Sequence, residues 1–209
     1  MKAQYIPALL EQDINVLEKK VNKLLTGQVI HLDIMDSTYT PSLKTVELAE
    51  ALEVLKKFRV QIHLMVNRAQ VYISQLTKNV ELCILHQDTY SNMAEFSQAV
   101  SEFKSAGVSI AATINPNSNL QLTDKVGEYQ IMGVFPGKSG QMMLENTKLR
   151  VVKLKQNLSK NGMIISVDGG VNQVNSKQLI EAGATKLIIN SALWKSPDAQ
   201  EMLNRLNKG

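Results

Sequence analysis

Apolar and polar positions alternate with two different periods along the chain. Eight short runs, rich in β-branched and other apolar residues, predict strands. These runs are Gln4–Pro7, Val29–Met35, Val60–Met65, Val80–Leu85, Val108–Ile114, Tyr129–Val134, Met163–Asp168 and Lys186–Asn190. Between them, apolar residues recur at steps of three and four, as at Ile14, Leu17 and Val21, which is the period of an amphipathic helix. The pattern therefore predicts eight strand–helix units.

Residues typical of helix ends support this division. Asn92, followed three residues later by Glu95, has the form of a capping box. Ser196 before Pro197 has the form of an N-cap followed by a first-turn proline, and Gly107 is suited to the left-handed position that ends a helix. We therefore expect helices to begin after Asn92 and Ser196 and one to end before Gly107.

Eight strand–helix units without a linker rich in proline, glycine or serine favour an α/β fold: one (β/α)8 TIM barrel that spans residues 1–209 as a single domain. A doubly wound open sheet is the competing topology. That fold usually has a glycine-rich phosphate turn after its first strand, but here this position reads Pro7-Ala8-Leu9-Leu10. We therefore expect the barrel, with its active site at the C-terminal ends of the strands.

The second predicted strand has an unusual face. Alternate residues of a strand point to the same side, so His31, Asp33 and Met35 share one face, while the residues between them are apolar. A face of this kind lines a functional site, holds a buried, hydrogen-bonded His–Asp pair, or is the exposed face of an edge strand. The strand taken alone leaves these interpretations open.

Polar residues also stand at the ends of other predicted strands. Together with the second strand, they form the set His31, Asp33, His63, His86, Asn115 and Asp168. All three histidines of the protein belong to this set. Two imidazoles and two carboxylates, from His31, Asp33, His63 and Asp168, suit Zn²⁺, Fe²⁺, Mn²⁺ or Co²⁺ better than Mg²⁺ or Ca²⁺. We expect these four residues to bind one divalent metal, and the alternative is a cluster held only by hydrogen bonds.

Flexible turns follow the last three predicted strands, where TIM barrels commonly bind phosphate through backbone N–H groups. The candidate phosphate- and substrate-binding residues are Gly137, Gly140, Gly169, Gly170, Asn190 and Ser191. Each glycine pair, taken singly, is also typical of an ordinary turn. Their shared position after consecutive strands favours the phosphate site.

Composition and charge narrow the function further. The net charge of +4 is mild, and the basic residues form no cluster interleaved with aromatic residues, so we expect no nucleic-acid partner. No apolar run is long enough for a signal peptide or a membrane span, which leads us to expect a cytoplasmic protein without a membrane partner. The single cysteine, Cys83, lies in an apolar run and is expected to be a reduced thiol of the core.

Five motifs, in this order along the chain, resemble those of the ribulose-phosphate 3-epimerase family. They are His31-Leu32-Asp33-Ile34-Met35-Asp36, Ile62-His63-Leu64-Met65-Val66, Asn115-Pro116, Met132 with Val134-x-Pro136-Gly137-x-x-Gly140-Gln141, and Val167-Asp168-Gly169-Gly170-Val171. The resemblance implies a barrel of the ribulose-phosphate-binding type and the metal ligands proposed above. It also implies a homo-oligomer, a dimer or a hexamer, and a place in the pentose phosphate pathway.

The resemblance further implies a reaction: epimerisation at C3 of the sugar phosphate D-ribulose 5-phosphate to D-xylulose 5-phosphate. Asp33 and Asp168 would act as the acid and base on opposite faces of a cis-enediolate. Met35, Met65 and Met132 resemble the thioethers that pack over it, although methionine is otherwise a common core residue. Asp36 points to the other side of its strand, and we expect a structural role for it.

The chain departs from the family pattern in its loops. The departures are Ala8 in place of a serine, Ser37-Thr38 in place of Gly/Asn-His, Lys138-Ser139 in place of Phe-Gly, and Asn190 in place of a glycine. Asparagine can adopt the left-handed conformation with modest strain, yet the side chain of Asn190 could crowd the phosphate. Two alternatives therefore stay open: a 3-epimerase of a ketohexose phosphate such as D-allulose 6-phosphate, and a sugar-phosphate-binding barrel without turnover. The related barrel decarboxylases are disfavoured because no Asp-x-Lys-x-x-Asp array is present around residues 31–36.

Overall fold

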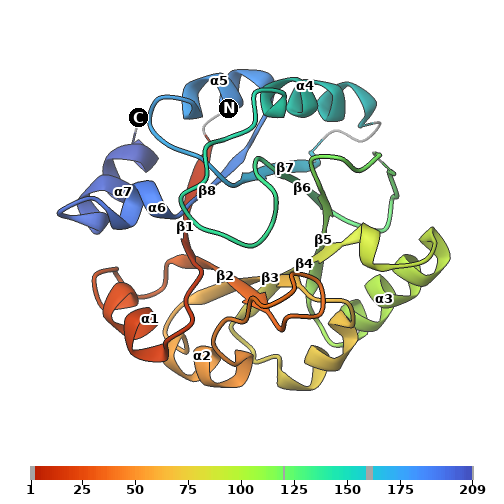
Figure 1. The fold of residues 1–209 in the computed structure, drawn as a ribbon, viewed down its shortest axis with the longest axis horizontal. Helices are drawn as coiled ribbons and strands as arrows, with labels where there is room; N and C mark the ends of the chain where they lie inside the picture. The colour runs from red at the N-terminus through yellow and green to blue at the C-terminus, as the bar shows by residue number, and fades with distance from the viewer. Residues whose placement is uncertain (1–2, 120, 159–161, 209) are drawn as a thin grey trace.

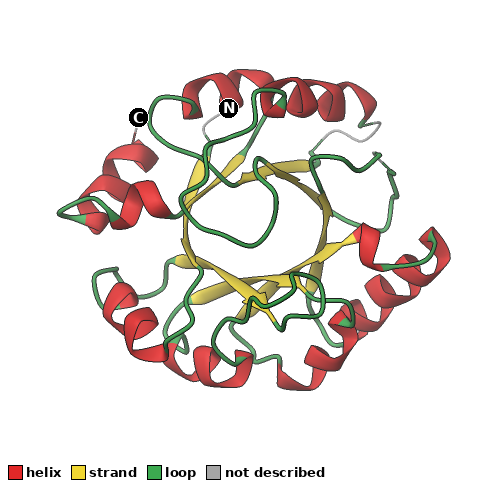
Figure 2. Ribbon diagram, viewed as in Figure 1, coloured by secondary structure: helices red, strands yellow, loops and turns green. Residues whose placement is uncertain are grey.

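A computed structural model describes residues 3–119, 121–158 and 162–208, and these form a closed barrel of eight parallel strands (Figures 1 and 2). The strands are paired in chain order, and β8 closes the barrel against β1. They are β1 (Gln4–Leu9), β2 (Val29–Met35), β3 (Arg59–Met65), β4 (Val80–His86), β5 (Ser109–Ile114), β6 (Glu128–Met132), β7 (Ile164–Asp168) and β8 (Lys186–Ile189). All eight predicted strands are present, with ends that differ from the prediction by no more than two residues. The predicted fold class is confirmed.

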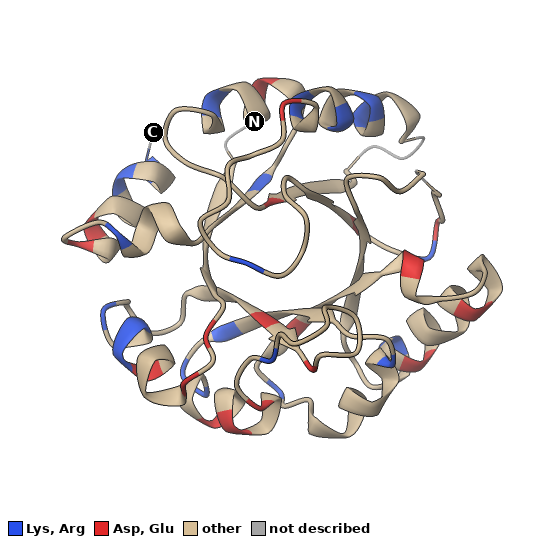
Figure 3. Ribbon diagram, viewed as in Figure 1, with Lys and Arg blue, Asp and Glu red and all other residues tan. Residues whose placement is uncertain are grey.

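The helices form an outer ring around the strands (Figure 2). The α-helices are α1 (Ile14–Val21), α2 (Leu48–Val54), α3 (Met93–Ser105), α4 (Thr147–Asn157), α5 (Ser176–Ala182), α6 (Ser191–Trp194) and α7 (Ala199–Lys208), and the 3₁₀-helices are η1 (Ala69–Gln75) and η2 (Gln87–Thr89). Basic and acidic residues are interspersed around this ring (Figure 3). Within the described ranges, no helix combines the length and the apolar character that a bilayer span requires.

The prediction of eight equivalent strand–helix units is wrong at two connections. A 3₁₀-helix, η1, replaces the α-helix between β3 and β4. Between β5 and β6, the described residues 115–119 and 121–127 contain no helix. The second connection begins Asn115-Pro116-Asn117-Ser118. Proline has a fixed φ that suits turns, and asparagine and serine side chains hydrogen-bond to nearby backbone, so this segment favours turns over helix.

The predicted helix ends are correct at α3 but not at α7. Asn92 Oδ1 accepts hydrogen bonds from the backbone N–H groups of Ala94 and Glu95, both at 3.0 Å, and Gly107 has a φ of +85°. Helix α7 instead begins after Asp198, whose Oδ1 accepts a hydrogen bond from Glu201 N at 2.8 Å. The predicted cap at Ser196 is therefore wrong, because the carboxylate of Asp198 caps the first turn two residues later.

Strand alternation divides the buried residues into two layers. Outward-facing residues such as Leu32 and Ile62 pack beneath the helices in the large core. Inward-facing residues include Ile6 and Ile188, which belong to a small separate apolar cluster. Polar residues face inward at both ends of the strands. Glu128 and Lys186 form an ion pair where β6 and β8 begin, and the histidines and aspartates of the candidate site lie towards the C-terminal ends.

Candidate active site

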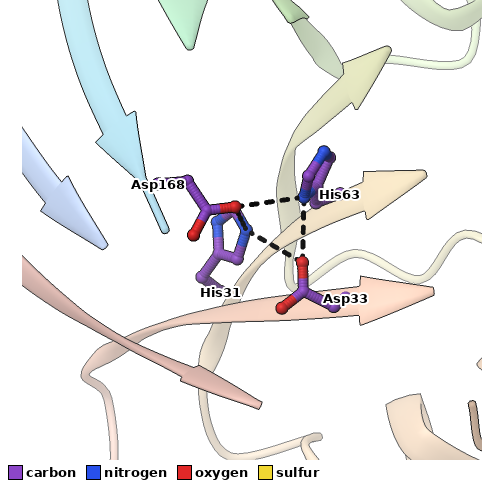
Figure 4. Close-up of side chains that lie close together, drawn as sticks. All are labelled: His31, Asp33, His63 and Asp168. Carbon is purple, nitrogen blue, oxygen red and sulfur yellow. Dashed lines mark hydrogen bonds and ion pairs between the residues drawn. The ribbon is translucent and has the colours of Figure 1, made fainter. Parts of the chain in front are cut away.

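Four side chains from three strands meet inside the C-terminal end of the barrel (Figure 4). They are His31 and Asp33 on β2, His63 on β3 and Asp168, the last residue of β7. Each offers one nitrogen or oxygen atom, and these four atoms lie within 4.8 Å of one another. All four residues are buried. The closed barrel thus brings together the whole metal set that the sequence analysis named.

His63 is in contact with both carboxylates. Its Nδ1 lies 2.8 Å from Asp33 Oδ1 and 3.4 Å from Asp168 Oδ2. His31 Nε2 lies at longer distances from the same two oxygens, 3.4 Å and 3.7 Å. One oxygen of each carboxyl group therefore faces both imidazoles.

The buried carboxyl and imidazole groups shift one another's pKa values. Burial raises the pKa of Asp33, but its interactions with His31 and His63 outweigh burial and hold the pKa of this carboxyl well below its usual range. Burial lowers the pKa of His63, whereas the neighbouring Asp168 and Asp33 carboxylates raise it, with a net pKa of about 9. Positive charge is therefore favoured at the point between the two carboxylates.

The four residues fit a divalent metal. Both ring nitrogens of His31 are buried, and neither has a hydrogen-bond partner among the described residues. A buried polar atom without a partner is costly, and a metal bond would remove that cost. The donor set of two nitrogens and two carboxylate oxygens suits Zn²⁺, Fe²⁺, Mn²⁺ or Co²⁺.

His86 and Asn115 lie beside this set but outside it. His86, at the end of β4, has its Nε2 2.8 Å from His63 Nε2, and burial lowers the pKa of His86 to about 4. Asn115 Nδ2 instead donates to Asp88 Oδ2 at 2.6 Å. Asp88 and Tyr39, which also contact each other, were missed by the sequence analysis. The position of Asp88 two residues after a strand-end histidine was the available signal.

A cavity opens next to Asp33 and Asp168. Its lining includes all the residues that the sequence analysis assigned to phosphate and substrate, namely Gly137, Gly140, Gly169, Gly170, Asn190 and Ser191. Three methionines are predicted to pack over the enediolate. Of these, Met65 and Met132 also line the cavity, whereas Met35 is buried but lies outside the lining. The loop that follows β6 arcs over this end of the barrel (Figure 1).

The glycine pair after β7 is required by packing. Gly169 and Gly170 have φ values of +100° and +71°, which favour glycine. A Cβ on Gly169 would lie 2.4 Å from Val134 Cγ2, and one on Gly170 would lie 2.5 Å from Met143 N. The turn therefore needs glycine for its close approach to the loop after β6, whether or not a phosphate is bound.

Of the residues that depart from the family pattern, Asn190 and Lys138 line the cavity and Ala8 does not. Asn190 has a φ of −113° and a ψ of −97°, so its backbone lies outside the left-handed region that asparagine can adopt. The buried carbonyl oxygen of Ala8 instead accepts a hydrogen bond from Trp194 Nε1 at 2.7 Å.

Ser37, the residue before Thr38, has a φ of +69° in the loop after β2. Asp36 stabilises this loop: its Oδ1 accepts hydrogen bonds from the Thr38 backbone N–H at 3.0 Å and from Thr38 Oγ1 at 2.6 Å. Asp36 is absent from the four-residue cluster. Its contacts agree with the structural role that strand alternation predicts.

Comparison with known proteins connects this arrangement to a family. The sequence model of the Ribulose-phosphate 3 epimerase family matches residues 4–194. Ribulose-phosphate 3-epimerase from Bacillus subtilis is 25% identical over 211 residues, which cover 96% of this chain and 96% of the relative. The chloroplastic ribulose-5-phosphate-3-epimerase of Arabidopsis thaliana is 28% identical over 207 residues, covering 94% of this chain and 73% of the relative.

Solved structures agree on the architecture. A mutant tryptophan synthase alpha-subunit from Pyrococcus furiosus superposes with a TM-score of 0.71 at 14% identity, covering 99% of this chain and 97% of that structure. Thiamine phosphate pyrophosphorylase from the same organism gives a TM-score of 0.61 at 12% identity, covering 99% and 94%. At these identities the similarity concerns the fold alone.

Proposed function

Because the chain belongs to the ribulose-phosphate 3-epimerase family of isomerases, we propose that it is a metal-dependent epimerase acting at C3 of a ketopentose phosphate. The proposed reaction converts D-ribulose 5-phosphate to D-xylulose 5-phosphate through a cis-enediolate. Asp33 and Asp168 are the proposed acid and base. The observation that carries this proposal is the convergence of these two carboxylates, from β2 and β7, on one pair of histidines beside a cavity.

The contacts of the carboxyl groups suit proton transfer. All contacts with the histidines use Asp33 Oδ1 and Asp168 Oδ2, as Figure 4 shows. The second oxygen of each group is thereby left for the substrate. Inversion at a carbon atom requires a proton to leave from one face and another to arrive at the opposite face, so two carboxyl groups from different strands can exchange the roles of base and acid. The reaction can then run in both directions.

His31, Asp33, His63 and Asp168 are the proposed ligands of one divalent cation. Such a cation supplies positive charge that stabilises the negative charge developing on the substrate oxygens. The buried histidines contribute neutral donors, and the two carboxylates balance the charge of the ion. Burial keeps water away, which strengthens each of these interactions.

The rest of the cavity is proposed to hold the sugar phosphate. The turns that contain Gly137, Gly140, Gly169 and Gly170 present backbone close to the cavity, where N–H groups can contact phosphate oxygens. Met65 and Met132 offer thioether and methylene groups that pack against the planar enediolate without competing for protons. Met35, which does not line the cavity, is proposed to support this surface from its place beside Met65, its register partner on β3.

The proposal is tested by hydrogen exchange. Protein stripped of metal and refilled separately with Zn²⁺, Fe²⁺, Mn²⁺ or Co²⁺ is incubated with D-ribulose 5-phosphate in D₂O. We expect deuterium at C3 and formation of D-xylulose 5-phosphate with at least one metal. Exchange with none of them would overturn the proposal. The ratio of kcat/KM for ribulose 5-phosphate and allulose 6-phosphate decides between the pentose and the hexose substrate.

The assembly and location of the enzyme are part of the same proposal. We expect a homo-oligomer, a dimer or a hexamer, acting in the cytoplasm. Light scattering coupled to size-exclusion chromatography measures the first, and cell fractionation measures the second. A monomer at micromolar concentration would contradict the oligomer.

A further inference from the structure

His86 contacts the proposed metal ligand His63, and Asp88 lies next to His86 on the side away from the proposed metal site. We propose that both are positioning residues, which hold His63 in the tautomer that leaves its Nδ1 free to bind a metal. The inference rests on the proposed function, because it assigns a task at the proposed metal site to residues that touch neither metal nor substrate.

The contact between the two histidines is close and well oriented. His63 Nε2 lies 2.8 Å from His86 Nε2, and the planes of the two rings differ by only 12°. Two ring nitrogens at this distance form a hydrogen bond only if one carries the proton and the other offers a lone pair. The contact therefore couples the tautomers of the two residues.

The metal site sets the direction of this hydrogen bond. His63 Nδ1 is the atom that faces Asp33 and Asp168, so a metal bond from His63 must use the Nδ1 lone pair. The proton of the neutral His63 ring is then on Nε2, which donates to His86 Nε2. As a result, the proton of a neutral His86 must be on its own Nδ1.

Asp88 favours this arrangement electrostatically. Its Oδ1 lies 3.7 Å from His86 Nδ1, beyond direct hydrogen-bond distance, and this nitrogen has no hydrogen-bond partner within the described part of the chain. A negative charge at that distance still favours a proton on the facing nitrogen over one on the far side of the ring. Metal-bound histidines commonly have their second N–H held by a carboxylate or a carbonyl group. Here a second imidazole stands between the ligand and the carboxylate.

Two further side chains hold Asp88 in position. Its Oδ2 accepts hydrogen bonds from the Tyr39 hydroxyl at 2.9 Å and from Asn115 Nδ2 at 2.6 Å. The Tyr39 ring also packs against the His86 ring, with centroids 4.7 Å apart. The carboxylate is therefore fixed by residues from the loop after β2 and from the end of β5.

Metal affinity tests the proposal without any need for activity. Co²⁺ is titrated into metal-free protein, and its dissociation constant is measured from the visible absorption bands in competition with a chelator. We expect His86→Leu to weaken Co²⁺ binding by roughly 10- to 100-fold and Asp88→Asn by a smaller factor. Because Asp88 acts through His86, the double variant should bind no more weakly than His86→Leu alone.

Two controls separate positioning from folding. His86→Gln, whose side-chain oxygen can accept the His63 proton, should restore most of the affinity. Gln87→Ala removes a side chain of the same turn whose contact is with the Gln121 carbonyl oxygen, outside the network, and should leave the affinity unchanged. Equal affinities for wild type, His86→Leu and Asp88→Asn would overturn the inference and leave the proposed function standing. Wild-type protein that binds no Co²⁺ would overturn both.

Nuclear magnetic resonance reports the tautomers directly. The protein has only three histidines, so long-range ¹H–¹⁵N spectra of the Zn²⁺-loaded form are simple to assign. We expect the proton of His63 on Nε2 and that of His86 on Nδ1. A His86 ring with its proton on Nε2 would contradict the proposal, whatever the affinities.

Discussion

Asp33 and His63 are register partners on the adjacent strands β2 and β3, and Asp33 Oδ1 lies 2.8 Å from His63 Nδ1. Asp168 reaches the same nitrogen, at 3.4 Å, from β7 on another side of the barrel. The histidine is thus contacted by two carboxylates that do not share a strand. Because the two aspartates come from different strands, we expect each to act on a different face of the substrate. Hydrogen-exchange experiments can distinguish these two roles.

We expect Asp33→Asn and Asp168→Asn to lower epimerisation by roughly 10²- to 10⁴-fold each, the usual contribution of a general acid or base. Each variant should still exchange the C3 proton of one epimer with solvent, because one base remains on one face, and the two variants should act on opposite epimers. Deuterium incorporation into ribulose 5-phosphate and xylulose 5-phosphate, measured separately, checks this. Asp124→Asn, at an exposed carboxylate, is the control, and exchange of the same epimer by both variants would contradict the assignment.

Lys138 is the only basic residue among the described residues that line the cavity, and it is exposed on the loop after β6. Its charge is therefore expected to attract the phosphate group of the substrate. We predict that Lys138→Met raises KM for the sugar phosphate by about 10-fold, equivalent to about 1.4 kcal/mol, and changes kcat by less than about twofold. Steady-state kinetics at two salt concentrations measure this. Lys19→Met, on the outer face of α1, should change neither constant, and an unchanged KM for Lys138→Met would remove Lys138 from the substrate site.

Gly170 and Gly107 both have positive φ, but only Gly170 has backbone close to the position of a Cβ. Alanine at Gly107 should cost about 1–2 kcal/mol of unfolding free energy through backbone strain alone. Alanine at Gly170 should cost more than this, because its Cβ would also lie 2.5 Å from Met143 N. Urea unfolding of both variants tests the difference. Equal losses would show that the loop after β6 moves freely away from the turn.

His31 has two buried ring nitrogens that lack hydrogen-bond partners among the described residues. In metal-free protein, His31→Leu removes an unsatisfied polar group but also a partner of the buried Asp33 carboxylate, so the unfolding free energy should change by less than about 1 kcal/mol. With metal added, wild type should be clearly more stable than the variant, because a ligand that binds only the folded state stabilises it according to its affinity. Denaturation with and without a chelator measures both. A large loss of stability in the chelated variant would contradict this account.

Burial raises the pKa of Cys83 from 9.0 to about 12. Native protein at pH 8 should therefore react with a thiol reagent far more slowly than unfolded protein does. Above pH 9 the unfolded chain loses its thiol proton while the folded chain keeps it, so stability should fall as pH rises, by up to about 2 kcal/mol at pH 10.5. Urea unfolding of wild type and Cys83→Ala across this range isolates the effect. Parallel pH profiles would contradict it.

Much of the fold could be predicted because each strand is marked by its own local pattern. The two connections that differ from the prediction are η1 and the segment after Asn115. At η1, Ala69, Tyr72, Ile73 and Leu76 recur with helical spacing, so the local pattern does not distinguish a 3₁₀-helix from an α-helix there. Asp198 was missed as a cap because the Ser196–Pro197 pair carries the same type of signal two residues earlier, and only the backbone geometry decides between them.

The sequence by itself determined the eight strands, the barrel class and the identity of the four residues that cluster, because strand alternation and strand ends are local properties of the chain. Only the tertiary structure decided that His63 lies between two carboxylates and His86, that Met35 lies outside the cavity lining, and that Gly170 is needed against Met143. These relationships depend on the register between neighbouring strands and on how loops after different strands pack together. Such distances arise from barrel closure, which no local stretch of sequence encodes.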